Sequence, residues 1–337
     1  MSIPTTRLGR TGLTVSRLAL GTMTFGLQTD EAVSHRILDK VAERGINFLD
    51  TANVYPLGGS IETAGRTEAI IGRWLRAQGP GGRGRFIVAT KAVGRMGPQA
   101  WNQGASRKHL LDAIDASLAR LQTDHVDLYQ LHSDDRSTPL DETLEALDVI
   151  VRSGRARYIG VSNFMAYRLA LALGRAELHR LTAFVSVQPR YSLLFREIER
   201  ELLPLAGEAG LGVIPYNPLA GGLLTGKYRG ADAPPEPNTR FTLGTAATMY
   251  QDRYWNERSF ATVAQLHRLA DEAGVPLATL AVAWVMANPL ITAPLLGASR
   301  PEQLDATLAA AEYTLDAGLK QRLDELTAEY RKGDAPR

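Results

Sequence analysis

The sequence of 337 residues predicts a (β/α)8 TIM barrel with an N-terminal β-hairpin that plugs the barrel bottom and an extra C-terminal helix. Two observations lead to this prediction. Eight short apolar segments alternate with amphipathic segments along the chain, as expected for parallel strands that are buried on both faces and joined by helices. Several helical segments end at a glycine, which supplies the left-handed residue that stops a helix.

The predicted strands are brief and apolar, which is typical of a parallel sheet covered on both sides. They span residues 18–21, 47–50, 86–91, 126–132, 156–162, 184–188, 212–217 and 292–296.

The predicted helices show apolar spacing near 3.6 residues, and Gly45, Gly154 and Gly210 follow three of them. They span residues 31–44, 65–77, 107–121, 140–152, 167–178 and 196–209.

Alternating strands and helices form either a doubly wound sheet or a closed barrel. Eight units favour the barrel, because about 250 residues is typical of that fold and insertions add to it. Residues 6–8 and 14–16 read as the hairpin, residues 234–237 as part of a long loop after the seventh strand, and residues 316–332 as the extra helix. No linker or internal repeat interrupts the chain, so we expect residues 1–337 to form a single domain.

The charges are balanced, with 38 basic and 36 acidic residues well mixed along the chain. This pattern argues against a nucleic-acid or membrane partner. No segment approaches the roughly 18 apolar residues of a membrane span, and the N-terminus lacks the apolar run of a signal peptide. The absence of cysteine excludes disulfide and thiolate chemistry and fits a cytoplasmic protein.

Three successive predicted strands end in ionisable residues. Asp50 ends the second strand, Lys91 the third and His132 the fourth, and Tyr55 follows five residues after Asp50. Each residue alone has an ordinary structural explanation, such as a helix cap, a solvent-exposed amine or a satisfied core histidine. Because barrel enzymes place their active sites at the carboxyl ends of the strands, their convergence predicts catalysis.

These residue types suit proton transfer coupled to hydride transfer. A carbonyl that accepts a hydride develops alkoxide charge and needs a proton donor within hydrogen-bond reach. Free tyrosine has a pKa of about 10, and we expect the ammonium of Lys91 to lower the pKa of Tyr55. Asp50 is expected to hold Lys91 in place, and His132 to donate a hydrogen bond that orients the substrate oxygen.

Four motifs resemble those of the aldo-keto reductase superfamily, in order and across essentially the whole chain. They are FLDTANVY at residues 48–55 with Gly72 downstream, ATK at 89–91, LYQLH at 128–132 and IGVSNF at 159–164. The resemblance implies a catalytic tetrad of Asp50, Tyr55, Lys91 and His132. It also implies reduction of an aldehyde or ketone by NADP(H), bound across the barrel mouth without a Rossmann motif.

The resemblance further implies which residues contact the cofactor. Those near the nicotinamide are Gly21, Thr22, Met23, Asp50, Ser162, Asn163, Gln188 and Tyr216. Those near the pyrophosphate are Asn217, Pro218, Leu219, Gly221 and Lys227, and Arg240 in the long loop is expected to close over the cofactor. Gln188 and Tyr216 also have a structural alternative, as a strand-end amide bonded to backbone and as a core aromatic residue.

A 2′-phosphate site is expected after the eighth strand, at Gly297, Ser299, Arg300 and Gln303. A helix N-terminus with a serine and an arginine suits a phosphate, which favours NADP(H) over NAD(H). The family usually has Glu-Asn where this chain has Ala306 and Thr307. Contacts to the adenine, and the strictness of the preference, are therefore expected to differ from those of the family.

Other chemical motifs are absent or out of context. The G-x-G-x-x-G match at residues 79–84 precedes a strand instead of opening a helix, and the glycines 21 and 26 lack the Lys-Ser/Thr of a P-loop. Six histidines without ligand-like spacing, together with no cysteine, predict no metal site. No G-x-S-x-G elbow supports serine hydrolysis.

The substrate is expected to be a small carbonyl compound that contacts Tyr55, Trp101 and His132. Met23, Arg190 and Tyr250 are further candidates for the pocket, and Trp101 has the alternative of an exposed rim residue. A rival hypothesis is a cofactor-binding regulatory or interaction module that resembles potassium-channel β-subunits. The sequence specifies neither the physiological substrate nor an oligomeric state.

Overall fold

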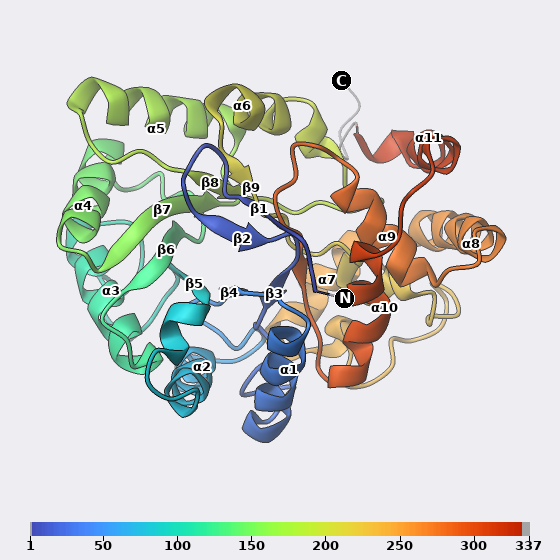
Figure 1. Cartoon of the computed structure of the whole chain (residues 1–337), viewed down its shortest axis with the longest axis horizontal. Helices are drawn as coiled ribbons and strands as arrows, with labels where there is room; N and C mark the ends of the chain where they lie inside the picture. Colours follow the sequence, from blue (N-terminus) through green and yellow to red (C-terminus); the bar gives the residue numbers. More distant parts are fainter. Residues whose placement is uncertain (1, 332–337) are drawn as a thin grey trace.

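Eight parallel strands curl into a barrel in the computed structural model, which describes residues 2–331 (Figure 1). Their order in the sheet is β10-β3-β4-β5-β6-β7-β8-β9. A parallel bridge between Val213 and Ile291 and a 2.8 Å bond from the Leu295 N–H to the Pro215 carbonyl join the two ends. The strands are β3 (Ala19–Gly21), β4 (Phe48–Asp50), β5 (Ile87–Ala92), β6 (Val126–Leu131), β7 (Ala156–Ser162), β8 (Ser186–Gln188), β9 (Gly212–Val213) and β10 (Leu295–Leu296). The predicted barrel is confirmed.

The helices surround this sheet (Figure 1). They are α1 (Glu31–Glu43), α2 (Arg66–Ala77), α3 (Arg107–Leu121), α4 (Leu140–Arg152), α5 (Ala166–His179), α6 (Leu202–Ala209), α7 (Ala247–Tyr254), α8 (Glu257–Glu272), α9 (Leu277–Met286), α10 (Asp305–Leu308) and α11 (Ala317–Leu326). Five of the six helices predicted between the first and seventh strands lie within one residue of their expected ends, and α7, α8 and α9 were not among the predicted ranges.

The predicted helix 196–209 is wrong in its first half. The chain forms a short 3-10 turn at Glu197–Glu199, and α6 begins at Leu202. Pro204 explains the break, because proline has no N–H and its ring clashes with the carbonyl four residues earlier, so it is tolerated only in the first turn of a helix.

The N-terminal hairpin fills the end of the barrel at which the strands begin. β1 (Thr5–Arg7) pairs antiparallel with β2 (Thr14–Ser16), one residue from the predicted position of its first strand. Leu8 and Val15 are fully buried in a cluster with side chains that point into the barrel, including Phe48 and Leu128. The predicted plug is confirmed.

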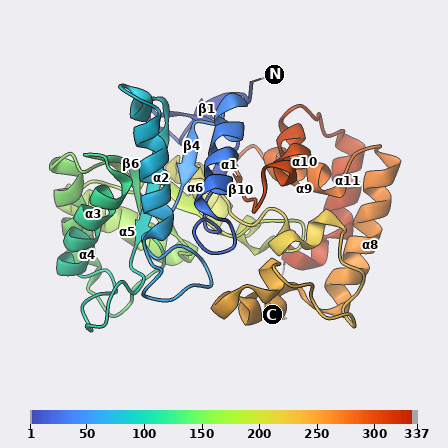
Figure 2. The ribbon, with the colours of Figure 1, turned by 90° about the horizontal axis from the view of Figure 1, so that it is seen from below.

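A long segment, residues 217–254, lies at the opposite end from the hairpin (Figure 2, yellow to orange). It contacts the loops after β3 and β4. A Cβ added to Gly58 would lie 2.7 Å from the Leu243 carbonyl oxygen, and Gln28 donates a hydrogen bond to the Asn238 carbonyl. The segment therefore covers part of the face where functional residues are expected.

The C-terminal helix is shorter than expected. α11 begins after Asp316, whose side chain accepts a hydrogen bond from the Leu319 N–H, and a 3-10 turn at Ala328–Arg331 follows it. Lys332, the predicted end of this helix, lies outside the described residues.

No single helix in the described part of the chain is long and apolar enough to cross a membrane. Within residues 2–331, one pair of helices, α8 and α9, reaches the required length and composition when taken together, but it is bent by 92° at the junction.

Candidate active site

A buried ion pair joins two neighbouring strands at the predicted site. Asp50 ends β4, and Lys91 lies near the end of β5 with its side chain fully buried. The Lys91 Nζ donates to Asp50 Oδ2 and, over 2.9 Å, to the Thr51 carbonyl. Burial lowers the pKa of Lys91, while the carboxylate of Asp50 opposes this change. The expectation that Asp50 fixes Lys91 and compensates its charge is confirmed.

Tyr55 lies next to this pair, 9% exposed, with the Lys91 Nζ 5.2 Å from its ring centroid. The expectation that Lys91 lowers the pKa of Tyr55 is wrong. Burial raises the pKa of Tyr55 well above its usual value, and the negative charge of Asp50 adds to the increase. The Lys91 ammonium is paired with that carboxylate, and its positive charge does not outweigh these two effects. Tyr55 is therefore protonated at neutral pH.

His132 follows β6 and packs edge-on against Tyr55, with ring centroids 5.6 Å apart. The Asn163 side-chain amide donates to the His132 carbonyl at 2.9 Å and holds this turn in place. Desolvation of the imidazole, with a contribution from the charge of Lys91, lowers the pKa of His132 to about 3. His132 is therefore neutral at physiological pH and has one N–H to donate.

We expect the pH profile of any carbonyl reduction at this site to show no inflection near pH 6.5, the usual histidine pKa. A folded pKa of about 3 places the loss of the neutral imidazole far below the range of about pH 5 to 9 in which kcat/KM would be measured. An inflection near pH 6.5 that disappears in His132→Asn would contradict the neutral state.

The residues expected around a nicotinamide lie together at the same strand ends. Ser162 donates to the Gln188 carbonyl at 2.8 Å, and the Gln188 side-chain amide donates to Asp50 Oδ1 at 2.8 Å. The Tyr216 hydroxyl donates to Asn163 Oδ1, also at 2.8 Å. The structural alternative for Gln188 was a side-chain bond to the backbone. Its amide instead donates to the Asp50 side chain.

The loop after β3 joins this cluster. The Thr22 hydroxyl and N–H both donate to the Asp50 carbonyl, at 2.9 and 3.1 Å. The Met23 carbonyl, two residues after Gly21, accepts from the Leu57 N–H in the loop that carries Tyr55.

The loop after β9 offers a backbone and side chains suited to an anion. Asn217 Oδ1 accepts from the Gly221 N–H at 2.7 Å. Gly221 and Gly222 have φ of 70° and 99°, in the left-handed region that favours glycine. Pro218 and Leu219 lie within this turn. Arg240 extends toward the same end of the barrel, and its buried Nη1 has no hydrogen-bond partner among the described residues.

The segment after β10 carries the remaining predicted cofactor residues. The Ser299 N–H and hydroxyl both contact Gln303 Oε1, at 2.8 and 3.2 Å. The positive charge of Arg300 contributes to the lowered pKa of Lys227, after desolvation as the main cause, so the two cations lie near each other. Gly297 is exposed, and a Cβ there would meet open space.

The helix predicted after Arg300 begins as a short 3-10 turn, Pro301–Leu304, that continues into α10. Thr307 is buried and its hydroxyl donates to the Leu304 carbonyl at 3.0 Å. The Thr307 hydroxyl therefore bonds to the backbone one turn earlier.

Two buried residues of the site were not assigned a role from the sequence. The Gln130 amide donates to Asp50 Oδ1 at 3.0 Å, so Asp50 accepts hydrogen bonds from Lys91, Gln130 and Gln188. Glu68 on α2 is fully buried, and Arg120 donates to it at 2.7 Å. The available signal for Gln130 was its position near the end of strand 126–131, two residues before His132.

The substrate candidates differ in their surroundings. Tyr250 on α7 is 2% exposed, whereas Trp101 is 52% exposed and forms no ring contact with the described residues. The Trp101 side chain is thus largely in solvent. Arg190 is half-buried beside Phe195, with its guanidinium 3.6 Å from the ring centroid.

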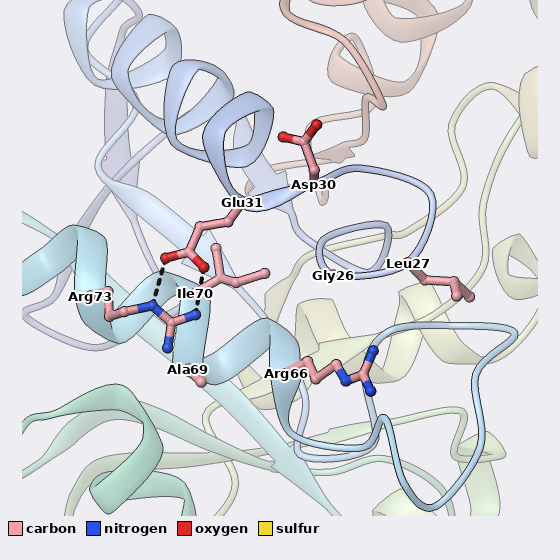
Figure 3. Close-up of a pocket in the computed structure, with 8 residues that line it drawn as sticks. All are labelled: Gly26, Leu27, Asp30, Glu31, Arg66, Ala69, Ile70 and Arg73. Carbon is pink, nitrogen blue, oxygen red and sulfur yellow. Dashed lines mark hydrogen bonds and ion pairs between the residues drawn. The ribbon is translucent and has the colours of Figure 1, made fainter.

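A separate surface pocket of about 480 Å³ lies between the start of α1 and the start of α2 (Figure 3). Gly26, Leu27 and Arg66 line it, and Glu31 and Arg73 in its wall are paired with each other. It includes none of the predicted site residues. Within residues 2–331, no group of three histidine, aspartate or glutamate side chains is placed to hold a metal ion.

The chain is similar over most of its length to known proteins. A model of the Aldo/keto reductase family matches residues 17–328. The chain is 43% identical over 329 residues to the uncharacterized oxidoreductase YrpG of Bacillus subtilis, covering 95% of each protein. It is 35% identical over 349 residues to Protein tas of Escherichia coli, covering 96% of this chain and 97% of that protein. It is also 36% identical over 308 residues to a probable voltage-gated potassium channel subunit beta of Arabidopsis thaliana, covering 90% of each.

Proposed function

Because the chain belongs to the aldo/keto reductase family, we propose that it reduces an aldehyde or ketone with NADPH, with Tyr55 as the proton donor. The observation that carries this proposal is the position of a protonated Tyr55 beside the buried Asp50–Lys91 pair and the neutral His132. A single carbonyl oxygen can then approach a phenolic O–H and an imidazole N–H together.

The residues present fit a dinucleotide cofactor. The unpaired Nη1 of Arg240, the glycines 221 and 222 and the neighbouring cations Lys227 and Arg300 suit phosphate oxygens. Ser162, Asn163, Gln188 and Tyr216 would hold the nicotinamide end, and Ser299, Arg300 and Gln303 a 2′-phosphate. When bound, the cofactor supplies the hydride.

The roles of the protein's own residues follow from their positions. His132 donates a hydrogen bond to the carbonyl oxygen and orients it. As charge develops on this oxygen, Tyr55 transfers its proton to it and becomes a phenolate. Lys91 stabilises that phenolate, and Asp50 keeps the ammonium in position while Gln130 and Gln188 hold the carboxylate. Water then returns a proton to Tyr55.

A carbonyl panel with NADPH oxidation as the readout tests this function. Continuous turnover on at least one aldehyde or ketone is expected. Stoichiometric loss of NADPH without turnover on any member would favour the binding module suggested by the potassium-channel relative. A cytoplasmic location and a single domain over residues 1–337 stay predictions.

The same assay tests the cofactor preference. NADPH is expected to give a kcat/KM at least about tenfold above that of NADH, since a charge-assisted phosphate contact is worth roughly 1.5–3 kcal/mol. Arg300→Gln should reduce this ratio by lowering the value for NADPH. Comparable kcat/KM values with the two cofactors in the wild-type protein would exclude the 2′-phosphate site.

A further inference from the structure

Two arginines extend the candidate active site on the side of β8 and β9. The parallel bridge between Arg190 and Tyr216 continues both strands beyond their last regular residues, and the Tyr216 N–H donates to the Pro189 carbonyl at 2.9 Å. Side chains alternate along a strand, so Arg190 lies on the same side as Gln188, which reaches Asp50 inside the barrel. Arg253 lies on α7, within the segment 217–254 that covers this end of the barrel.

Aromatic rings hold both arginines. The guanidinium of Arg190 lies 3.6 Å from the Phe195 ring centroid and 5.9 Å from that of Tyr254. Stacking occupies the face of a guanidinium and leaves its in-plane N–H groups free. The guanidinium of Arg253 lies 5.9 Å from the Tyr250 ring centroid.

The two arginines share a neighbour. Burial raises the pKa of Tyr216, and the positive charges of Arg253 and Arg190 both oppose that increase. The Tyr254 ring beside Arg190 and the Tyr250 ring beside Arg253 have centroids 6.4 Å apart, so the two arginines adjoin the same group of aromatic rings.

Neither arginine has an anionic partner within residues 2–331. No carboxylate lies within 4.0 Å of either guanidinium, although both side chains are half-buried. Exposed arginines such as Arg66 also lack a carboxylate, but water surrounds them. Two partly desolvated cations without a counter-ion are unfavourable, and an anionic ligand would relieve this.

This cationic element is close to the proton donor. The Tyr216 hydroxyl donates to Asn163 Oδ1, and the Asn163 amide donates to the carbonyl of His132, whose ring packs against Tyr55. Because Tyr216 is bridged to Arg190, this arginine lies at the same strand ends as Tyr55.

We propose that the physiological substrate is an aldehyde or ketone that carries a carboxylate, which Arg190 and Arg253 bind while Tyr55 protonates the carbonyl oxygen. The inference rests on the proposed reductase function. A planar guanidinium matches a carboxylate in a two-bond arrangement, and two guanidinium groups offer donors to both of its oxygens.

A pair of matched substrates tests this specificity. The substrate 4-carboxybenzaldehyde and its methyl ester, methyl 4-formylbenzoate, share the ring and the reacting carbonyl but differ in charge. With NADPH, kcat/KM for the acid is expected to exceed that for the ester by about 10–100-fold. Arg190→Gln and Arg253→Gln should each reduce this ratio by about tenfold, and Arg190→Lys should retain part of it. Arg66→Gln is the matched control and should keep the wild-type ratio.

The outcomes separate the inference from the function on which it rests. An ester reduced as well as the acid would overturn the inference and leave the reductase function intact, whereas a carbonyl panel with no turnover would overturn the function itself. The dissociation constant for NADPH is measured in the same variants. If it changes as much as the substrate ratio does, the arginines bind the cofactor and the assignment is wrong. The ratio of kcat/KM for glyceraldehyde 3-phosphate to that for glyceraldehyde is compared with the ratio for the acid and the ester. A larger ratio for the phosphate pair would show a phosphate site instead of a carboxylate site.

Discussion

Replacing Tyr55 by phenylalanine is expected to lower kcat for carbonyl reduction by about 10²–10⁴-fold, the usual contribution of a positioned proton donor. The substitution removes only the hydroxyl. The ring that packs edge-on against His132 stays, so the shape of the site and the affinity for NADPH should change little. Steady-state kinetics and a fluorescence titration with NADPH measure the two quantities.

Tyr167→Phe provides the matched control, because Tyr167 is 55% exposed on α5, far from these contacts along the chain. It should have wild-type kcat. A Tyr55→Phe protein that keeps kcat within about twofold of wild type would refute the donor role, and one that loses NADPH binding would show that Tyr55 acts through the cofactor site.

Breaking the Asp50–Lys91 pair is expected to lower the free energy of unfolding by about 3–5 kcal/mol, because it leaves one buried charge uncompensated. In Lys91→Met, the Asp50 carboxylate keeps its bonds from Gln130 and Gln188 but loses its counter-ion. In Asp50→Leu, the ammonium is left with the Thr51 carbonyl. Urea denaturation measures both variants.

The double variant Asp50→Leu/Lys91→Met should be more stable than the sum of the single changes predicts, because it removes both charges. Lys108→Met is the control. Its 2.7 Å pair with Asp112 is exposed on α3, and such pairs contribute less than about 1 kcal/mol. Equal losses for Lys91→Met and Lys108→Met would contradict the assigned burial of the Asp50–Lys91 pair.

Local patterns in the sequence were sufficient for the barrel and for the four residues at its centre. Short apolar strands are visible without a structure, and an ionisable residue that ends such a strand lies at a known face of the barrel. Asp50, Lys91 and His132 lie at the strand ends where this pattern predicts them. The start of α6 differs from the prediction, because Pro204 is tolerated only in the first turn of a helix.

The remaining features depend on residues that are far apart in the sequence. Gln130 meets Asp50 across 80 positions, and Glu68 meets Arg120 across 52. The direction of the pKa shift of Tyr55 depends on its burial and on Lys91 being already paired. Neither property follows from the spacing of these residues along the chain.

The N-terminal hairpin sets the side from which a ligand can reach the candidate active site. Leu8 and Val15 pack against Phe48 and Leu128 and fill the end of the barrel at which the strands begin. A molecule that contacts Tyr55 therefore approaches from the opposite end, where residues 217–254 lie (Figure 2). The hairpin thus determines the direction of access although its residues are at the other end of the barrel.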